Sequence, residues 1–238
     1  MATTTDGAPR EALPALNLTA FIAFATRSHG RALALLVVVS FLAFLPGFFH
    51  IPPIDRDEAR FAQATKQMIE TGNYVDIRFQ DESRYKKPIG IYWLQAAVVR
   101  TAETLGMPDA RTKIWLYRIP SLLGAMGAVL LTYWAALAFV SRRAALLAGL
   151  MLATCVLLGV EARLAKTDAM LLLTVVAAMG ALGRIYLAKP GAQIDLNGGW
   201  ILPAIFWTAV AGGILLKGPL ILMFVALTAI SLSILDRS

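Results

Sequence analysis

Residues 52–93 read PPIDRDEARFAQATKQMIETGNYVDIRFQDESRYKKPIGIYW, a charged and aromatic stretch in an otherwise apolar chain. Of the 15 acidic residues in the chain, nine lie between His50 and Lys113, and ten of the 22 lysines and arginines lie there too. A loop of this length without its own core is more often functional than a passive connection. We therefore expect residues 50–117 to carry the chemistry of the protein.

The chain as a whole is too apolar for a soluble domain, because 58% of its residues are hydrophobic. Six segments approach the roughly 20 residues that span a bilayer. They are residues 32–49, 118–140, 144–160, 169–187, 200–216 and 218–235. The sequence thus predicts an all-α polytopic membrane protein with about six transmembrane helices. The first segment has no cleavage pattern, so we expect it to stay in the protein as a signal anchor.

The distribution of positive charge predicts the orientation of these segments. With the N-terminus in the cytoplasm, the short inner segments hold eight lysines and arginines and the short outer loops hold three. Residues 1–30 would then form a cytoplasmic tail and residues 31–238 a membrane domain. The long loop 50–117, residues 159–170 and residues 215–220 would all lie at the same external face, where clustered charges usually mark a substrate path.

Two amphipathic helices are expected inside the long loop. One starts near Glu58, has apolar residues at helical spacing and stops at Gly72. The other starts at Pro88, which suits a first helical turn, and ends near Gly106. Both patterns are typical of helices that lie along a membrane interface. We expect residues 73–87, between them, to be extended or irregular.

Three carboxylates are candidates for catalysis. Asp57 and Glu58 stand at the start of the first loop helix, and Asp168 stands at the start of the fourth apolar segment. A carboxylate held at a helix start can act as a general base. The alternative is purely structural, since Asp is a preferred N-cap and the pair Asp55 and Glu58 has the spacing of a capping box.

Cations and one tyrosine near the same motifs are candidates for binding substrate or phosphate: Arg60, Arg84, Tyr85, Lys87 and Lys217. Arginine offers a bidentate fork and lysine a compact charge, and both suit a lipid-linked phosphate. A snorkelling side chain with a solvated head is the alternative. That alternative has equal weight for Lys86, whereas Lys87 and Lys217 adjoin Pro or Gly-Pro breaks that favour binding.

Several classes of site are absent from the sequence. It has no P-loop, no GxGxxG after a strand and no HExxH, and His29 and His50 are isolated. The single Cys155 excludes an internal disulfide, and we expect it to be a small buried apolar side chain. We therefore expect neither a metal nor another cofactor. The net charge of +7 fits membrane topology and anionic lipids, so nucleic acid is not an expected partner.

DEARFAQATKQMIETGNY followed by RYKKPIGIYWLQA resembles the first external loop of lipid-linked-sugar transferases with the GT-C fold. The most similar branch is the bacterial aminoarabinose-transferase and protein-mannosyltransferase-like family. Four motifs match in order: Asp57, Glu58, Arg60 and Phe61; Lys87, Pro88, Tyr92 and Trp93; Asp168; and Lys217 with Gly218. The resemblance covers residues 32–235. Family members are commonly longer, so the chain is expected to be a fragment or a short form. The position before Lys87 is often acidic in the aminoarabinose branch and is Lys86 here, which argues against a metal.

The resemblance implies a glycosyltransferase of the bacterial inner membrane. Its donor would be a polyprenyl-phosphate-linked sugar, and its acceptor a lipid, glycan or protein at the external, periplasmic face. Asp57 would be the base, with Asp168 and Glu58 as further acidic groups, and Lys87, Arg60 and Lys217 would stabilise the departing phosphate. The alternatives are a catalytically inactive fragment and a non-enzymatic subunit or transporter half. Transporters place charges near the bilayer midplane, whereas the charges here cluster at one face.

Overall fold

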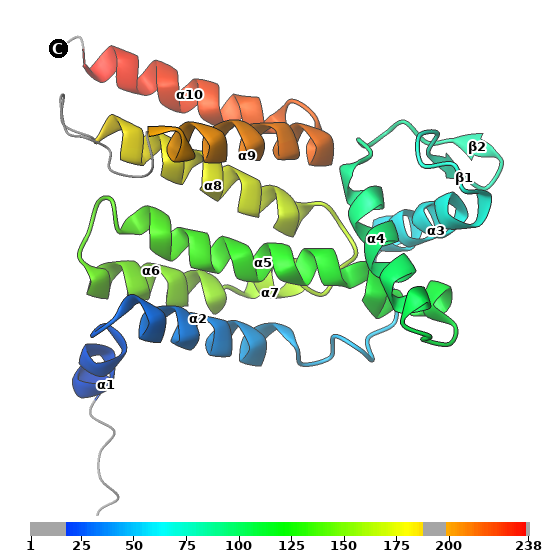
Figure 1. The fold of residues 1–238 in the computed structure, drawn as a ribbon, viewed down its shortest axis with the longest axis horizontal. Coiled ribbons are helices and arrows are strands. Elements are labelled where there is room, and N and C mark those ends of the chain that lie inside the picture. The colour runs from blue at the N-terminus through cyan, green and yellow to red at the C-terminus, as the bar shows by residue number, and fades with distance from the viewer. Residues whose placement is uncertain (1–17, 188–198, 237–238) are drawn as a thin grey trace, which may run out of the picture.

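The computed structural model describes residues 18–187 and 199–236, which are mostly helical. Figure 1 shows a bundle of elongated helices with a smaller part, which we call the head (residues 55–112), at one end. The bundle contains α2 (His29–Phe44), α5 (Ile114–Ala136), α6 (Arg142–Ala153), α7 (Val156–Glu161), α8 (Asp168–Tyr186), α9 (Ile201–Lys217) and α10 (Leu220–Leu235). The head contains α3 (Arg56–Thr71), β1 (Arg78–Phe79), β2 (Glu82–Ser83), α4 (Gly90–Thr104) and the 3-10 helix η1 (Ala110–Thr112).

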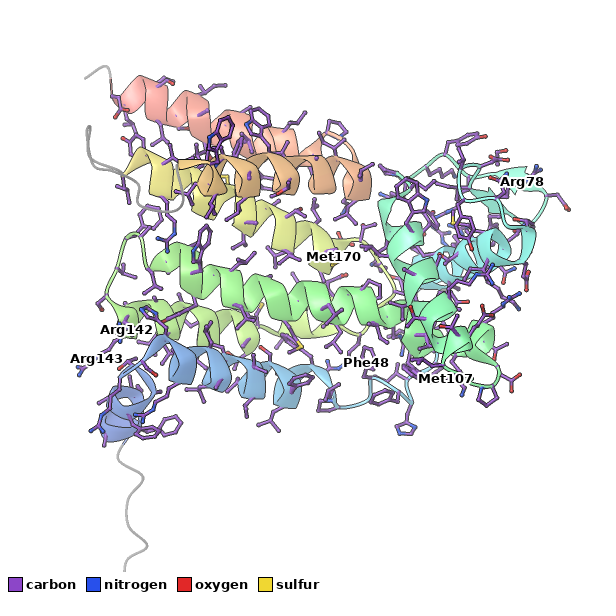
Figure 2. The ribbon with its side chains drawn as sticks, viewed as in Figure 1. Phe48, Arg78, Met107, Arg142, Arg143 and Met170 are labelled. Carbon is purple, nitrogen blue, oxygen red and sulfur yellow. The ribbon has the colours of Figure 1, made fainter. Side chains whose placement is uncertain are left out.

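A short helix, α1 (Leu18–Ala25), lies at the end of the bundle opposite the head. It falls inside residues 1–30, for which the sequence predicts a cytoplasmic tail. Residues 1–17 of that tail lie outside the described part of the chain, as does Lys189 of the charge count. Figure 2 shows Arg142 and Arg143 at the same end as α1, while Arg78 and Met107 lie in the head.

Helix α5 is the centre of the bundle. It packs against α2, α6 and α8, and α9 and α10 follow on the far side of α8. The close approach of α5 to α8 needs a glycine, because a Cβ at Gly124 would lie 2.8 Å from the backbone nitrogen of Met170. On the other side, Leu36, Tyr133 and Leu146 are buried between α2, α5 and α6. The bundle is thus held by apolar side chains and small residues.

Each of the six apolar segments contains helix, but the third is not continuous. Helix α6 ends at Ala153 and α7 begins at Val156. At the break, the hydroxyl of Thr154 donates to the carbonyl of Leu150 (3.0 Å), a contact that bends helices. Cys155 is exposed there, so the expectation of a buried thiol is wrong. Of the described helices, α5 and α8 are long and apolar enough to cross a membrane, and α2, α9 and α10 are shorter apolar helices.

Helix α3 follows its sequence pattern closely. Asp55 is its N-cap, and Gly72 ends it in the left-handed conformation with φ +70°. The apolar positions at helical spacing are all buried: Phe61, Ala64, Met68 and Ile69. Thr65, which lies between them, is buried too. The prediction of a first amphipathic loop helix is therefore confirmed.

Helix α4 is the second predicted loop helix, shortened by two residues at each end. Pro88 precedes it, and the carbonyl of Ile89 accepts its first helical hydrogen bond from Trp93 (3.2 Å). Between α3 and α4, β1 and β2 pair antiparallel, with Arg78 opposite Ser83. The expected irregular segment thus contains a two-residue ladder whose turn places Gln80 at φ 57°.

Candidate active site at the junction of head and bundle

The candidate site lies where the start of α3, the α7–α8 connection and the end of α9 meet. Figure 1 shows the α7–α8 connection and the start of α5 at the end of the bundle that faces the head. Helix α4 approaches α9 so closely that a Cβ at Gly90 would lie 2.6 Å from the carbonyl oxygen of Leu215. A Cβ at Gly218 would meet Pro88 at 4.0 Å. The segments that carry Lys87 and Lys217 are therefore neighbours.

Asp57 lies in the first turn of α3 and is accessible. Its side chain is 48% exposed and forms an ion pair of 3.4 Å with Arg60, one turn further along the helix. Asp57 also lies close enough to Tyr92 to contribute to its raised pKa, although burial of that phenol is the main cause. The guanidinium of Arg84 donates to the Tyr92 hydroxyl (3.3 Å) and lies over the ring of Phe61. The start of α3 thus carries a charged patch made of Asp57, Arg60 and Arg84.

Asp55 is the structural carboxylate of this helix start. It accepts a hydrogen bond from the backbone N–H of Asp57 (2.6 Å) and another from the Lys166 ammonium (3.0 Å). The backbone hydrogen bond, and after it the Lys166 contact, lower the pKa of Asp55. Asp55 therefore caps α3, as the structural interpretation predicted. The carboxylate of Asp57 does not cap the helix.

Glu58 turns inward, away from any substrate. It is fully buried and forms two hydrogen bonds with Arg118 of α5, of 2.7 and 3.2 Å. It also accepts from the backbone N–H of Ala165 (3.0 Å). The capping box with Asp55 does not form, because this buried guanidinium occupies the carboxylate. The burial of Glu58 therefore argues against the expected catalytic role and favours a positioning role.

Asp168 and Lys217 form an ion pair between the start of α8 and the end of α9. Both side chains are partly exposed. The N-cap of α8 is Thr167, so Asp168 is not the capping residue that the alternative interpretation required. Two residues from separate sequence motifs are thus brought together at the face of the bundle next to the head.

The remaining candidates lie on the segment before α4. Lys87 is half-buried and Lys86 is exposed, and neither has an ion-pair partner among residues 18–187 and 199–236. Tyr85 is exposed and donates to Asp76 (2.8 Å), within the head. Of the three, Lys87 combines partial burial with an uncommitted charge.

Three further charged residues reach this junction, and sequence reasoning did not select them. They are Arg118, Glu161 and Lys166. The Lys166 ammonium lies 3.0 Å from Asp55 and 3.8 Å from Glu161. Glu161 and Lys166 belong to the charged segment 159–170, which the charge bias of the sequence predicts to lie at the external face. The charges of that segment could have marked these residues as candidates. Their contacts with α3, however, are visible only in the tertiary structure.

The described part of the chain holds no group of three or more His, Cys, Asp or Glu side chains arranged for a metal ion. The site is built instead from alternating carboxylates and cations. Such a set can bind an anionic group through its lysines and accept a proton at a carboxylate.

The comparison with solved structures identifies the fold. The chain superimposes on the crystal structure of ArnT from Cupriavidus metallidurans in the apo state with a TM-score of 0.71 and 19% identity. The match covers 93% of this chain and 37% of that one. The ArnT structure bound to undecaprenyl phosphate gives a TM-score of 0.69 at 20% identity, over 92% of this chain and 36% of that one. The chain has the GT-C fold of these transferases.

Sequence relatives agree with this fold. An undecaprenyl phosphate-alpha-4-amino-4-deoxy-L-arabinose arabinosyl transferase from Erwinia tasmaniensis is 29% identical over 163 residues, which is 68% of this chain and 27% of the relative. A transferase of the same name from Aeromonas hydrophila is 28% identical over 178 residues, 72% of this chain and 30% of the relative. An uncharacterized protein from Aquifex aeolicus is 32% identical over 120 residues, 50% of this chain and 27% of the relative. No family model matches the chain.

The chain therefore spans about a third, or less, of the length of the relatives it matches. The resemblance to the aminoarabinose-transferase branch is found in both sequence and fold.

Proposed function

We propose that this chain is part of an integral membrane glycosyltransferase that takes a sugar from a polyprenyl-phosphate donor. The observation that carries this proposal is that the segments bearing Asp57, Asp168, Lys87 and Lys217 come together at one junction, where Asp168 pairs with Lys217. The fold supports it, since the matched ArnT structure was solved with undecaprenyl phosphate bound. The names of the relatives support an undecaprenyl-phosphate-linked donor. The acceptor would be a lipid, glycan or protein.

The proposed reaction is a displacement at the anomeric carbon of the donor sugar. The acceptor hydroxyl forms the new C–O bond, and its proton passes to Asp57, which is exposed and free of a capping task. The bond between the anomeric carbon and the phosphate oxygen breaks, and the polyprenyl phosphate leaves with the electron pair. The reacting sugar develops oxocarbenium character, as in glycoside chemistry generally.

The cations would stabilise the phosphate as it gains charge. Lys87 is uncommitted in this structure, whereas Arg60 pairs with Asp57 and Lys217 with Asp168. A lysine ammonium has three N–H donors, so Lys217 can hold Asp168 and a phosphate oxygen together. Asp168 would thereby fix Lys217 at the site and serve as its second acidic group. Arg84 and Tyr85 would contribute to binding from the edge of the head.

This reaction requires the head to lie at the external, periplasmic face of the inner membrane. In this proposal residues 31–238 form the membrane domain with about six spans, the loop 50–117 is external, and the N-terminus is cytoplasmic. The position of Arg142 and Arg143 at the end of the bundle away from the head agrees with a cytoplasmic location for that end (Figure 2).

A transfer assay tests the proposal. The purified protein in lipid nanodiscs would be given a polyprenyl-phosphate sugar and membrane acceptors, and sugar transfer would be measured. We expect Asp57→Asn to abolish transfer and leave thermal stability nearly intact. Asp55→Asn is the matched comparison, because asparagine still caps the helix while the negative charge that pairs with Lys166 is removed. Activity that survives Asp57→Asn but not Asp55→Asn would mean that Asp55 is the base. Donor binding without transfer by the unmodified protein would favour the inactive-fragment alternative.

A further inference from the structure

Lys166 links the helix that carries Asp57 to the connection that leads to Asp168. Its ammonium donates to Asp55 (3.0 Å), the N-cap of α3, and lies 3.8 Å from Glu161 at the end of α7. The backbone around Lys166 is fixed independently, because its carbonyl accepts a hydrogen bond from Ser121 of α5 (3.0 Å). The side chain is therefore directed to the junction by a rigid backbone.

This ammonium has capacity left for an anion. Lysine has three N–H donors, and one of them serves Asp55. The contact with Glu161 is an ion pair at 3.8 Å, longer than a hydrogen bond. The Lys166 side chain is 19% exposed, so it is accessible as well as held. Burial disfavours its charge, but Asp55 and Glu161 raise the pKa of Lys166 above its ordinary value, which keeps it cationic.

Glu161 lies among the charges of both ion pairs at the junction. The charged groups that act on it are Lys166 of the α7–α8 connection, Asp168 of α8, Lys217 of α9 and Asp55 at the start of α3. One of its oxygens is buried and has no hydrogen-bond partner. Burial is the main cause that raises the pKa of Glu161, and Asp168 and Asp55 add to it. An ionised Glu161 is thus poorly compensated, and a second anion nearby would disfavour it further.

We propose that Lys166 is a further ammonium ligand of the donor's phosphate group, besides Lys87 and Lys217, and that Glu161 weakens this binding while it is ionised. The inference rests on the proposed function and adds two residues that the sequence motifs do not contain. Lys166 would contact the phosphate with an N–H that does not serve Asp55. Phosphate binding would favour the protonated form of Glu161, because like charges close together cannot both remain ionised without cost.

Binding of undecaprenyl phosphate to the purified protein in nanodiscs, measured without any sugar, tests this inference. We expect Lys166→Met to weaken binding by at least about tenfold, the scale of one charge-assisted contact. Lys166→Arg should retain most of the affinity because it keeps the charge. Lys86→Met is the matched control, since Lys86 is exposed and unpaired, and it should change the affinity by less than about twofold.

Glu161→Gln provides a result that misfolding cannot imitate. It removes the charge but keeps the shape, so we expect tighter binding than in the unmodified protein at neutral pH. This advantage should shrink as the pH falls, because the Glu161 carboxyl then becomes protonated as well. Equal affinities for Lys166→Met and Lys86→Met, or weaker binding by Glu161→Gln, would overturn the inference while the unmodified protein still binds the lipid. Failure of the unmodified protein to bind at any pH would instead overturn the proposed function.

Discussion

Glu58 and Arg118 form a fully buried ion pair that joins the first turn of α3 to the first turns of α5. Arg118 also donates to three carbonyls of the segment that leads into α3: those of Phe48, Ile51 and Pro52. Glu58 in turn holds the backbone of Ala165, three residues before Asp168. One ion pair thus fixes both Asp57 and Asp168 relative to the bundle.

Breaking this pair should destabilise the protein strongly. Loss of one partner leaves an uncompensated buried charge, which costs about 3–5 kcal/mol. We expect Glu58→Gln and Arg118→Met each to lower the thermal midpoint markedly in detergent and to reduce transfer in proportion to the folded fraction. The double variant should recover part of the stability, because it buries no unpaired charge. A stable but inactive Glu58→Gln protein would return Glu58 to the catalytic residues.

Lys87 and Lys86 should differ although they are adjacent. Lys87 precedes Pro88, which biases its backbone to an extended form, and it lies near the start of α4, where backbone amides attract anions. We expect Lys87→Ala to slow sugar transfer from a polyprenyl-phosphate donor by at least about tenfold and Lys86→Ala to change it little. Equal small effects would exclude both lysines from phosphate binding.

Asp55 should contribute a pH-dependent part of the stability. Its pKa is lowered in the folded protein, so its contribution is fully present above its ordinary value of 3.8 and is lost as the pH falls through the lowered value. Thermal unfolding of the unmodified protein and of Asp55→Asn should therefore differ by a constant amount near neutral pH. The two should converge in acid. A difference that persists at the lowest pH would show that the Asp55 charge is not involved.

Gly90 should be needed for the approach of α4 to α9. A Cβ there would lie 2.6 Å from a backbone oxygen of Leu215, so the two helices would have to separate. We expect Gly90→Ala to cost about 1–3 kcal/mol and to impair phosphate binding by displacing Lys87. Gly30→Ala in α2 is the control, because its Cβ would meet nothing within 4 Å. Similar thermal midpoints for the two variants would contradict this packing argument.

The orientation can be tested with topology reporters. The bias of lysine and arginine predicts that a reporter fused after Ser83 is external and one fused after Arg143 is cytoplasmic. The reverse pattern would place the head in the cytoplasm and remove the basis for transfer at the external face.

The sequence predicted the elements that depend on neighbouring residues. The sequence predicted the apolar face of α3, its end at Gly72 and the second loop helix near Pro88. These features could be predicted because residues three and four apart share a helix face. The break at Thr154 and Cys155 was not readable, since the apolar run continues across it. The ordered motifs also indicated a resemblance that the fold and the sequence relatives share.

Only the tertiary structure decided which charged residues are buried in ion pairs and which stay accessible. The sequence places three carboxylates, Asp55, Asp57 and Glu58, at one helix start. Packing then buried Glu58 against Arg118, 60 positions away, joined Asp55 to Lys166, 111 positions away, and left Asp57 exposed. The physical reason is that local propensity fixes a helix and its ends, whereas the partner of a charge is fixed by which distant helices the bundle brings together. Asp168 and Lys217, 49 positions apart, meet for the same reason.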